Sequence, residues 1–578
     1  AAPNAPFRRV RPSDAGWPSA ASWAKLKTEV GGRLIKLESP LTACKTAPEG
    51  AACGSTLKDL ANPYFISDEP AYTQASGWVD AWTSTPSVYA VAAENTNDVI
   101  AAVNFARKNN LRLVVKGGGH SYLGTSNSPD SLLIWTHPMN KITMHDAFVG
   151  SGCEGRQKPQ PAVTVEAGAI WMHTYDEVTT KNGRYVQGGG CATVGVAGLI
   201  QSGGFGSFSK NYGTAAAALI EAEVVTADGK VLIANSCQHA DLYWAIKGGG
   251  GGSLGVVTKV TLRTRELPAF FGGAFGKIRA TSDEAYRRLI SKVISFYQES
   301  LFNPHWGEQI GFRSGNRVEF SMVFCGLDQK QAQDVWLPFT KWIAESPQDF
   351  VIDSPMQVLA IPARNFWDAK FWKNIPQFVV KDDRPGAPER NIFWIGDAEQ
   401  PGQMLHAYRS AWLPASLLSK DSQQHLADAI FESTRHWGFG LHFNKGLAGA
   451  PPAEIEAARD TATNPEVLDA FALAITATSG RAFPGVRGHE PNIDEAHRNS
   501  IRVNRSMDTL LKAAPSAGSY VSESDFFEKD WQRSYWGTNY PKLAKIKKKY
   551  DPEGLFFVHH GVGSEEWSED GFVRLKGS

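Results

Sequence analysis

The sequence predicts an α+β fold, and three patterns support this expectation. Residues 111–115 form an apolar run of strand length that directly follows an amphipathic helical pattern. Two β-branched runs at 223–227 and 230–234 are joined by Asp-Gly, a pair typical of β-hairpins. Amphipathic helices are expected around 283–299 and 328–344. The chain therefore mixes strands and helices, and it shows no repeat and no low-complexity stretch.

The first strongly patterned element is expected after residue 88. Residues 1–80 are rich in proline, glycine and serine, so we expect an irregular segment that wraps the surface. Asn97 is a suitable N-cap for a helix that reaches Asn110. The strand at 111–115 follows, then a glycine loop, and a further strand is expected at 162–166.

A glycine run lies between the elements that follow the hairpin. The pattern predicts a short helix at 240–246 and an alternating strand at 256–263. Gly250, Gly252 and Gly255 satisfy the spacing G-x-G-x-x-G, which binds dinucleotides where a helix follows. Because a strand is expected here instead, the pattern argues against a Rossmann fold. These glycines let the backbone approach a ligand or turn a tight corner.

Charge and composition exclude several classes of function. Lys plus Arg and Asp plus Glu both total 59, so no basic field is available to hold nucleic acid or an anionic membrane. No run of eighteen apolar residues exists, so no membrane-spanning helix is expected. The sequence begins Ala-Ala-Pro-Asn without Met, which is typical of a chain after signal-peptide removal. We therefore expect a secreted or exported protein, extracellular or periplasmic.

Six cysteines fit an oxidising compartment. Cys44 and Cys53 lie close together in a loop rich in Pro, Gly and Thr, so we expect them to form a disulfide. One further cysteine is assigned below to a cofactor. The other three cannot all pair, so at least one stays free; they are Cys153, Cys237 and Cys325. No pair has C-x-x-C spacing, and no metal site is expected.

Two glycine turns, each presenting one nucleophilic side chain, are the most informative motifs. Lys116-Gly-Gly-Gly-His-Ser-Tyr-Leu-Gly-Thr125 presents His120, and Gly188-Gly-Gly-Cys-Ala-Thr-Val-Gly195 presents Cys191. Glycines without a Cβ let backbone N–H groups come close to a flat or anionic ligand. An imidazole and a sulfur in two such turns suit covalent attachment of a cofactor at two points.

The two runs resemble the flavin-attachment motifs of the berberine-bridge-enzyme-like branch of the vanillyl-alcohol-oxidase superfamily. In that branch Gly-Gly-His-Ser-Tyr bonds its histidine to the flavin 8α-methyl carbon. Cys-x-Thr-Val-Gly, followed by Gly-Gly-Phe-Gly, bonds its cysteine to C6. The chain contains both patterns, the second at 191–195 and 203–206. The resemblance implies bicovalent FAD, 8α-histidyl through His120 and 6-S-cysteinyl through Cys191.

The resemblance extends over residues 80–268 and 515–561 and implies a division of the chain. Its FAD-binding domain, of the two-subdomain p-cresol-methylhydroxylase type, is expected at 81–268, after the N-terminal segment 1–80. A substrate or cap domain with an antiparallel sheet backed by helices is expected at 269–514. Residues 515–578 are expected to pack back on the FAD-binding domain.

Further cofactor-binding residues follow from the same motifs. Asn539 and Tyr540 are expected near the flavin ring, where they would bond its pyrimidine edge. The others are Lys116, Gly117, Gly118, Gly119, Ser121, Gly124, Thr125, Val194, Gly195, Gly198, Gly203, Gly206, Gly255 and Val257.

Oxidation of an alcohol or amine also needs a base opposite the flavin ring. Oligosaccharide-oxidising relatives carry an Asn-Tyr-x-Asp element whose tyrosine is the base. The equivalent segment here is Ser522-Glu-Ser-Asp525, so Glu523 replaces the tyrosine. Glu523 is the candidate base, and a solvated or salt-bridged carboxylate is the alternative.

Three further side chains are candidates for the substrate face. His442 lies on a strand-like segment that is a candidate to face the flavin, with a core or surface histidine as the alternative. Tyr122 either stacks near the ring or fills the core. Tyr520 is the next candidate base after Glu523 and His442.

We therefore expect an FAD-dependent oxidase. It would transfer hydride from a bulky alcohol, sugar or secondary metabolite to flavin N5 and return electrons to O₂, giving H₂O₂. Its expected partners are a small-molecule or oligosaccharide substrate and O₂, with no nucleic acid and no membrane, and the chain is expected to be a monomer. Two alternatives stay open: an FAD-dependent dehydrogenase with another acceptor, and a flavin-binding protein without turnover.

Overall fold

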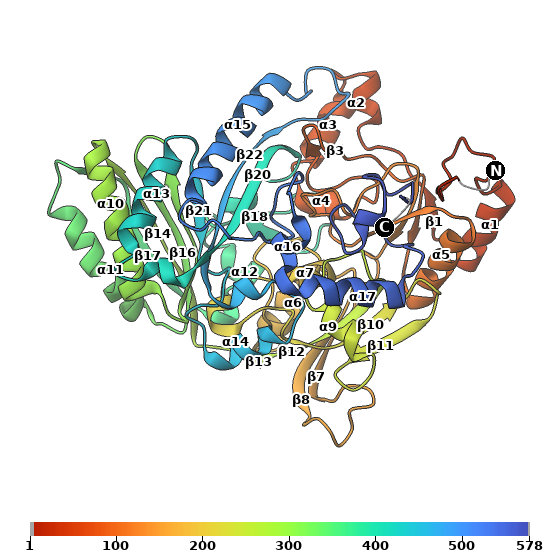
Figure 1. The fold of residues 1–578 in the computed structure, drawn as a ribbon, viewed down its shortest axis with the longest axis horizontal. Helices are drawn as coiled ribbons and strands as arrows, with labels where there is room; N and C mark the ends of the chain where they lie inside the picture. The colour runs from red at the N-terminus through yellow and green to blue at the C-terminus, as the bar shows by residue number, and fades with distance from the viewer. Residues whose placement is uncertain (1–4, 576–578) are drawn as a thin grey trace.

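The computed structural model describes residues 5–575, which form an α+β fold with three larger sheets (Figure 1). The sheets have four, five and nine strands. The nine-stranded sheet and its helices occupy one side of the molecule, and the two smaller sheets occupy the other (Figure 1). The expected fold class is confirmed.

The four-stranded sheet carries the first glycine loop. Its strand order is β1-β4-β6-β5, with β4, β6 and β5 parallel and β1 antiparallel to β4. The strands are β1 (Leu34–Lys36), β4 (Tyr89–Ala92), β5 (Arg112–Lys116) and β6 (Ser131–Trp135). The helix α5 (Thr96–Lys108) joins β4 to β5. Asn95, not Asn97, is its N-cap: the Asn95 backbone is extended, and its side chain accepts a hydrogen bond from the Asp98 N–H at 2.9 Å.

The five-stranded sheet contains the expected hairpin. Its order is β11-β10-β12-β8-β7, and every neighbouring pair is antiparallel. The strands are β7 (Ile142–Phe148), β8 (Gln160–Glu166), β10 (Leu219–Val225), β11 (Val231–Asn235) and β12 (Val256–Arg263). Because β12 follows the glycine run, the argument against a Rossmann reading is confirmed. The hairpin of β7 and β8 projects from the body of the molecule (Figure 1).

The nine-stranded sheet is long and almost entirely antiparallel. Its order is β17-β14-β16-β15-β21-β22-β20-β2-β3, and only β2 pairs in parallel, with β20. Helices α10, α11, α13 and α15 cover one face (Figure 1). The strands are β2 (Gly77–Trp78), β3 (Trp82–Thr83), β14 (Phe270–Ala280), β15 (Trp306–Arg313), β16 (Arg317–Cys325), β17 (Phe350–Pro362), β20 (Gln403–Pro414), β21 (Phe439–His442) and β22 (Ala470–Arg481).

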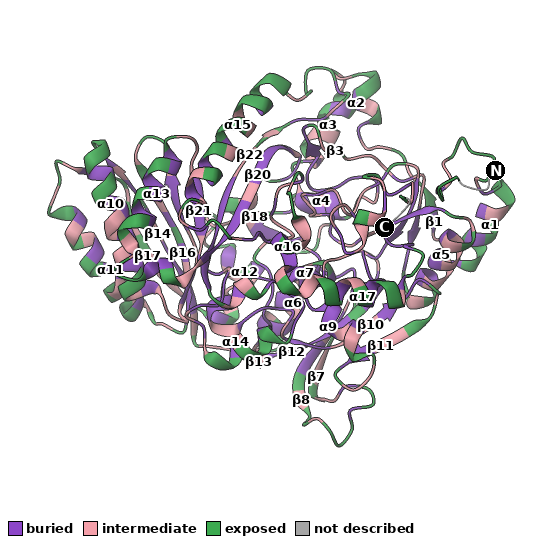
Figure 2. Cartoon of the chain, in the orientation of Figure 1, coloured by how far each residue is buried: buried purple, intermediate pink, exposed green. Residues whose placement is uncertain are grey.

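Side chains alternate along β16, so the two faces of the nine-stranded sheet contact different surroundings. Phe320 and Phe324 are buried in the cluster beneath the helices. Ser321 and Val323 instead line a cavity on the opposite face. The covering helices are α10 (Asp283–Phe296), α11 (Gln329–Ala344), α13 (Gln423–Thr434) and α15 (Ile493–Leu510). Figure 2 shows these helices exposed on their outer side and buried toward the sheet.

The N-terminal eighty residues are more regular than expected. They contain α1 (Ala20–Glu29), α2 (Thr42–Thr46), α3 (Ala51–Asp59) and α4 (Pro63–Ser67) as well as β1. Ser19 caps α1, and Trp23 and Leu26 are buried against the core that α5 also enters. The expectation of an irregular segment is therefore wrong for much of this stretch.

The C-terminal residues return to the sheet that carries the first glycine loop. Phe556 forms a bridge with Leu113 of β5, and Lys549 on α17 pairs with Asp241 on α9 at 2.7 Å. The remaining helices and strands are α6 (Trp171–Tyr175), β9 (Arg184–Tyr185), α7 (Val196–Ser202), α8 (Ser209–Tyr212), α9 (Ala240–Ile246), β13 (Arg265–Glu266), α12 (Ala369–Trp372), β18 (Val379–Lys381), β19 (Ile392–Trp394), α14 (Pro452–Arg459), α16 (Trp531–Trp536) and α17 (Tyr540–Tyr550).

Two disulfides join residues of this fold. Cys44 bonds to Cys53, as expected, and Cys153 bonds to Cys237. Cys325 is a free, buried thiol. Among the described residues no helix is long and apolar enough to cross a bilayer, and no cluster of side chains suits a metal ion.

We predict that the two disulfides stabilise the protein unequally. They close loops with sequence separations of 9 and 84 residues, and a longer closed loop removes more entropy from the unfolded chain. Replacing both Cys153 and Cys237 by serine should lower the free energy of unfolding by about 4 kcal/mol, against about 2 kcal/mol for Cys44 and Cys53. Denaturant titration followed by tryptophan fluorescence measures both values, and equal losses would contradict the entropic account.

Candidate functional site

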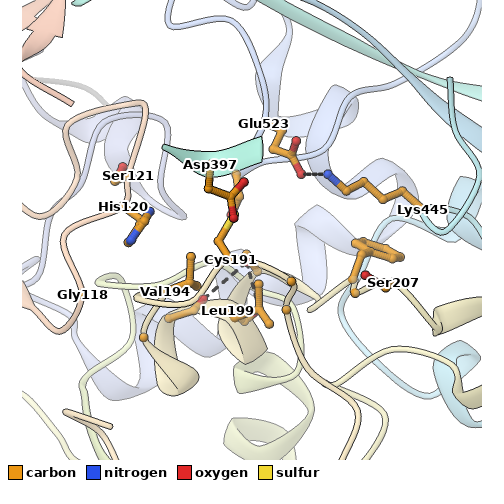
Figure 3. Close-up of a pocket in the computed structure, with 18 of the residues that line it drawn as sticks. Gly118, His120, Ser121, Cys191, Val194, Leu199, Ser207, Asp397, Lys445 and Glu523 are labelled. Carbon is orange, nitrogen blue, oxygen red and sulfur yellow. Dashed lines mark hydrogen bonds and ion pairs between the residues drawn. The ribbon is translucent and has the colours of Figure 1, made fainter. Parts of the chain in front are cut away.

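A large cavity lies where the two glycine turns face the nine-stranded sheet. Its volume is about 890 Å³. Its wall includes both turns, the glycine run at 250–252, the inner face of β14 to β16 and the segments 520–523 and 558–561. Figure 3 shows side chains from these separate parts of the chain directed into one space.

Close backbone packing at Gly118 brings the two turns together. A Cβ at Gly118 would lie 2.6 Å from the Thr193 carbonyl oxygen and 2.8 Å from the Gly195 nitrogen. Real Cβ atoms do not approach backbone atoms so closely, so only glycine allows this contact. The contact places His120 and Cys191 on the wall of the same cavity.

His120 is held as a neutral imidazole. Its Nε2 lies 2.7 Å from Thr193 Oγ1. Burial lowers the pKa of His120 to about 4, so the ring is uncharged near neutral pH. Among the described residues no hydrogen bond reaches Nδ1, which leaves that nitrogen available to a ligand.

Cys191 is a free thiol that opens on the cavity. Burial raises the pKa of the thiol well above its ordinary value, and the charge of Asp397 adds to the effect. Gln400 Oε1 lies 4.0 Å from the sulfur. The thiol is therefore protonated at neutral pH and needs a base before it can act as a nucleophile.

Most of the predicted cofactor-binding residues lie on the cavity wall. The glycine turns and the start of β12 contribute bare backbone and small side chains. The wall includes Gly117, Gly118, Gly119, His120, Ser121, Thr125, Cys191, Val194, Gly195, Gly198, Gly206, Gly255 and Val257.

The shape of this wall fits a flavin dinucleotide. At Gly198 no protein atom lies within 4 Å of an ideal Cβ, so the backbone is open to the cavity. The volume falls in the upper part of the range of about 300–1,000 Å³ that is usual for ligand and cofactor pockets. One long, glycine-lined space that ends at a neutral imidazole and a thiol suits a large cofactor held at two points.

Three predicted residues have packing roles outside the cavity wall. Lys116 donates through Nζ to backbone carbonyls of the segment 69–72, at 2.8 Å for Pro70 and 2.7 Å for Tyr72. At Gly124 a Cβ would lie 2.6 Å from the Trp82 ring, and at Gly203 it would lie 3.1 Å from a Thr463 methyl. The contact of these residues with the cofactor stays a prediction.

Asn539 and Tyr540 also lie away from the cavity. Asn539 donates through Nδ2 to the Thr463 carbonyl at 2.9 Å. Tyr540 donates to the Glu565 carboxylate at 2.7 Å. Both side chains have partners within the C-terminal packing, and their expected place beside the flavin ring stays a prediction.

Glu523 lies on the cavity wall, as a salt-bridged carboxylate. It pairs with Lys445 (Figure 3). Tyr408 donates its hydroxyl to Oε2 of Glu523 at 2.8 Å. Burial alone would lower the pKa of Lys445, but the charge and hydrogen bond of Glu523, together with the charge of Glu308, raise that pKa. Tyr122 stacks on Tyr408 with ring centroids 5.0 Å apart.

The other candidate catalytic side chains share this cavity. His442 lines it from β21, and burial with the charge of Lys445 lowers the pKa of His442 well below its ordinary value. Tyr520 lines it too, with its hydroxyl 3.2 Å from Ser202 Oγ. The structure therefore brings together all four predicted catalytic candidates.

Sequence reasoning missed several residues of the site. Lys445 lies three positions after His442, beyond the end of the expected strand. This position near His442 was the only feature of the sequence that could have indicated Lys445. Tyr408, Asp397 and Glu308 lie in segments without a distinctive motif. Glu308 has a left-handed backbone with φ of 63° and accepts a hydrogen bond from Ser207 Oγ at 2.6 Å.

Aromatic side chains form the wall of the cavity between β14 and the segment 366–394. Several are only partly buried, and they supply flat apolar surface for a bulky molecule. They are Phe275, Phe366, Trp367, Trp372, Phe378 and Trp394.

The chain is similar in sequence to flavin-dependent proteins. Residues 87–235 match the family model "FAD binding domain", and residues 519–563 match "Berberine and berberine like". FAD-linked oxidoreductase malF of Malbranchea aurantiaca is 30% identical, over 97% of this chain and 93% of that protein. VAO-type flavoprotein oxidase VAO615 of Thermothelomyces thermophilus is 26% identical, over 99% of this chain and 96% of that protein.

Solved structures show the same fold. VAO-type flavoprotein MtVAO615 from Myceliophthora thermophila C1 matches with a TM-score of 0.80 and 25% identity, over 98% of this chain and all of that one. Glucooligosaccharide oxidase from Acremonium strictum, described as carrying 6-S-cysteinyl, 8α-N1-histidyl FAD, matches with a TM-score of 0.64 and 19% identity. That match covers 91% of this chain and 99% of the other.

We predict that Gly118→Ala separates the two turns. The new Cβ meets backbone atoms of Thr193 and Gly195, which cannot rotate away. Overpacking of this kind should lower the free energy of unfolding by about 2 kcal/mol. Gly54→Ala on α3 is the matched control, since nothing lies within 4 Å of its Cβ. Denaturant titration should show a loss in the first variant alone; a loss of equal size in both would contradict the close-packing account.

Proposed function

Because the chain belongs to the FAD-linked oxidoreductases with a vanillyl-alcohol-oxidase type flavin domain and a berberine-bridge-like C-terminal segment, we propose that it is a bicovalent FAD-dependent oxidase. The observation that carries this proposal is the meeting of His120 and Cys191 on one glycine-lined cavity wall. Nδ1 of His120 is the ring nitrogen free to form a bond, because Nε2 faces Thr193. The Cys191 thiol is the second point of attachment.

The chemistry divides between the cofactor and the chain. When bound, the flavin accepts hydride from the substrate and passes electrons to dioxygen. Glu523 takes the proton from the substrate hydroxyl or amine at a carboxylate oxygen. Lys445 and the Tyr408 hydroxyl fix the position of that carboxylate. Tyr122, stacked on Tyr408, limits movement of the phenol.

The cavity favours a bulky substrate. Its aromatic wall offers stacking surface to sugar rings, aromatic alcohols or polycyclic secondary metabolites. Two covalent bonds would retain the cofactor without enclosing it, so the substrate side can stay open. Relatives and neighbours include both FAD-linked oxidoreductases and an oligosaccharide oxidase, which is consistent with either substrate type.

The two alternatives make different predictions for electron acceptance. A dehydrogenase would use the same cavity and the same proton acceptor but would react slowly with dioxygen. A flavin-binding protein without turnover would not be bleached by any substrate under argon. Stopped-flow reoxidation by oxygen separates the first alternative from the oxidase, and an anaerobic bleaching screen separates the second.

Export from the cell is part of the proposal. Two disulfides are typical of an oxidising compartment. We further propose that the chain acts as a monomer, with a small molecule or oligosaccharide and O₂ as its partners.

We predict two separable covalent bonds to FAD. Denatured protein should stay yellow, and its intact mass should exceed that of the polypeptide by one FAD. His120→Ala and Cys191→Ala should each leave one bond, whereas the double variant should release all its flavin on acid precipitation. Release of free flavin from the unmodified protein would contradict the assignment.

We predict that Glu523→Gln slows substrate oxidation while the fold and the bound flavin are retained. The amide keeps the shape but cannot accept the proton, so anaerobic bleaching should slow by about 10²- to 10⁴-fold. Asp525→Asn is the matched control in the same segment, because the Asp525 carboxylate accepts from the Phe527 N–H outside the cavity wall. An unchanged rate in Glu523→Gln would transfer the role of base to His442 or Tyr520.

A further inference from the structure

Asp397 is a cavity carboxylate that the proposed proton transfer from substrate leaves without a role. It ends a short 3-10 helix, Ile395–Asp397, that follows β19. Asp397 and Cys191 line the same two cavities, and Figure 3 shows their side chains next to each other at the cavity wall. The thiol donates to Oε1 of Gln400 at 4.0 Å. Gln400 donates through Nε2 to Oδ1 of Asp397 at 3.1 Å. The thiol therefore has an oriented proton acceptor beside it.

The other carboxylates of the cavity are held by partners of their own. Glu523 pairs with Lys445. Glu308 accepts from Ser207 Oγ at 2.6 Å. The ionisable groups that face Asp397 and Cys191 are Glu308, Lys445, Glu523, Tyr122 and Tyr408.

We propose that Asp397 is the general base that removes the thiol proton when Cys191 forms its bond to FAD. This inference rests on the proposed bicovalent attachment and extends it to the residue that drives the cysteinyl bond. The carboxylate is placed to act on the thiol because both side chains line the same cavities and Gln400 contacts both of them.

The step balances with dioxygen as the oxidant. The S–H bond of Cys191 breaks, and its proton goes to Asp397. The sulfur electron pair forms the bond to ring carbon C6, and the hydrogen on C6 leaves as a proton. The two electrons gained by the ring pass to dioxygen, which takes up two protons and becomes hydrogen peroxide.

The two pKa values fit a base that acts as the bond forms. Burial, together with the charge of Glu308, raises the pKa of Asp397 to about 7. Burial raises the pKa of the Cys191 thiol well above its ordinary value. Unassisted ionisation of the thiol is therefore rare at neutral pH, whereas about half of the Asp397 side chains can accept a proton.

A smaller second cavity offers a route for that proton. Its volume is about 180 Å³, and its wall includes Cys191, Asp397 and Gln400. Asp397 also lines the main cavity, so it stands between the two spaces. The proton can leave through the smaller cavity without crossing the space that the cofactor fills.

The test compares covalent attachment in full-length variants by peptide mapping. In Asp397→Asn the His120 bond should be complete, whereas formation of the Cys191 bond should be slower by on the order of 10²-fold. Asp397→Glu should restore part of the rate. Asp525→Asn is the matched control, because it removes a carboxylate that lies outside the cavity wall; its Cys191 bond should form as in the wild type.

A second measurement uses the full-length wild-type chain produced in flavin-depleted cells, so that it carries no flavin before it is mixed with FAD at pH 5 to 9. Only deprotonated Asp397 accepts the proton, so the rate of Cys191 attachment should rise with pH and level off above about 7. A rate that climbs without levelling through pH 9 would indicate direct thiol ionisation and would overturn the proposal. This profile decides the question even if Asp397→Asn does not fold.

The outcomes separate this inference from the proposed function. If the wild-type protein has no bond at Cys191, the proposed bicovalent attachment itself is wrong. If the Cys191 bond forms as fast in Asp397→Asn as in the wild type, only the proposed role of Asp397 is wrong. Equal slowing in Asp397→Asn and Asp525→Asn would assign the effect to the loss of any carboxylate and would also overturn the proposal.

Discussion

The site depends on one close backbone contact, that of Gly118 with Thr193 and Gly195. The loop that holds Gly118 leaves the parallel strand β5, and the turn that holds Thr193 belongs to a different part of the fold. Without a side chain at 118 the two backbones touch, and His120 Nε2 reaches Thr193 Oγ1. The same contact sets Cys191 across the cavity wall from the imidazole. Two nucleophiles that are 71 positions apart in sequence thereby become one site.

Three carboxylates face this cavity, and their surroundings give them different properties. Glu523 pairs with the Lys445 ammonium group and accepts a hydrogen bond from the Tyr408 hydroxyl. Glu308 accepts a hydrogen bond from the Ser207 hydroxyl, and burial raises the pKa of Glu308. Asp397 accepts a hydrogen bond from the Gln400 amide, and burial with the charge of Glu308 raises the pKa of Asp397 to about 7. Titratable groups whose environments differ in this way can carry separate proton-transfer tasks in one space.

Local sequence patterns predicted the parts of the fold that depend on near neighbours. The helix at 240–246 and the strand at 256–263 are found with those bounds, because turn residues and apolar periodicity decide them. The cap of α5 moved from Asn97 to Asn95, since both residues suit a cap and the extended backbone of Asn95 depends on the end of β4. The helices of residues 1–80 were missed because each is short and is stabilised by distant contacts, as at Trp23.

The same distinction between local patterns and distant contacts explains which residues of the site could be predicted. His120 and Cys191 were found because each stands in a motif with its own glycines. Lys445 and Tyr408 were not found, because their roles come from pairing with Glu523 across strands that are far apart in sequence. Asn539 and Tyr540 stand in a motif whose side chains make hydrogen bonds within the C-terminal packing, so the motif alone does not place them on the cavity wall.

The ion pair of Lys445 and Glu523 joins the two halves of the cavity. Lys445 follows the end of β21 in the nine-stranded sheet, and Glu523 belongs to the segment that leads back toward the flavin domain. Both side chains are largely buried, with 13% and 17% exposed, so loss of either partner would leave a poorly solvated charge. The pair thus fixes the position of the sheet's inner face relative to the two glycine turns. Because the aromatic wall starts from that same sheet, the distance between this wall and the Glu523 carboxylate is set by the fold and not by a mobile loop.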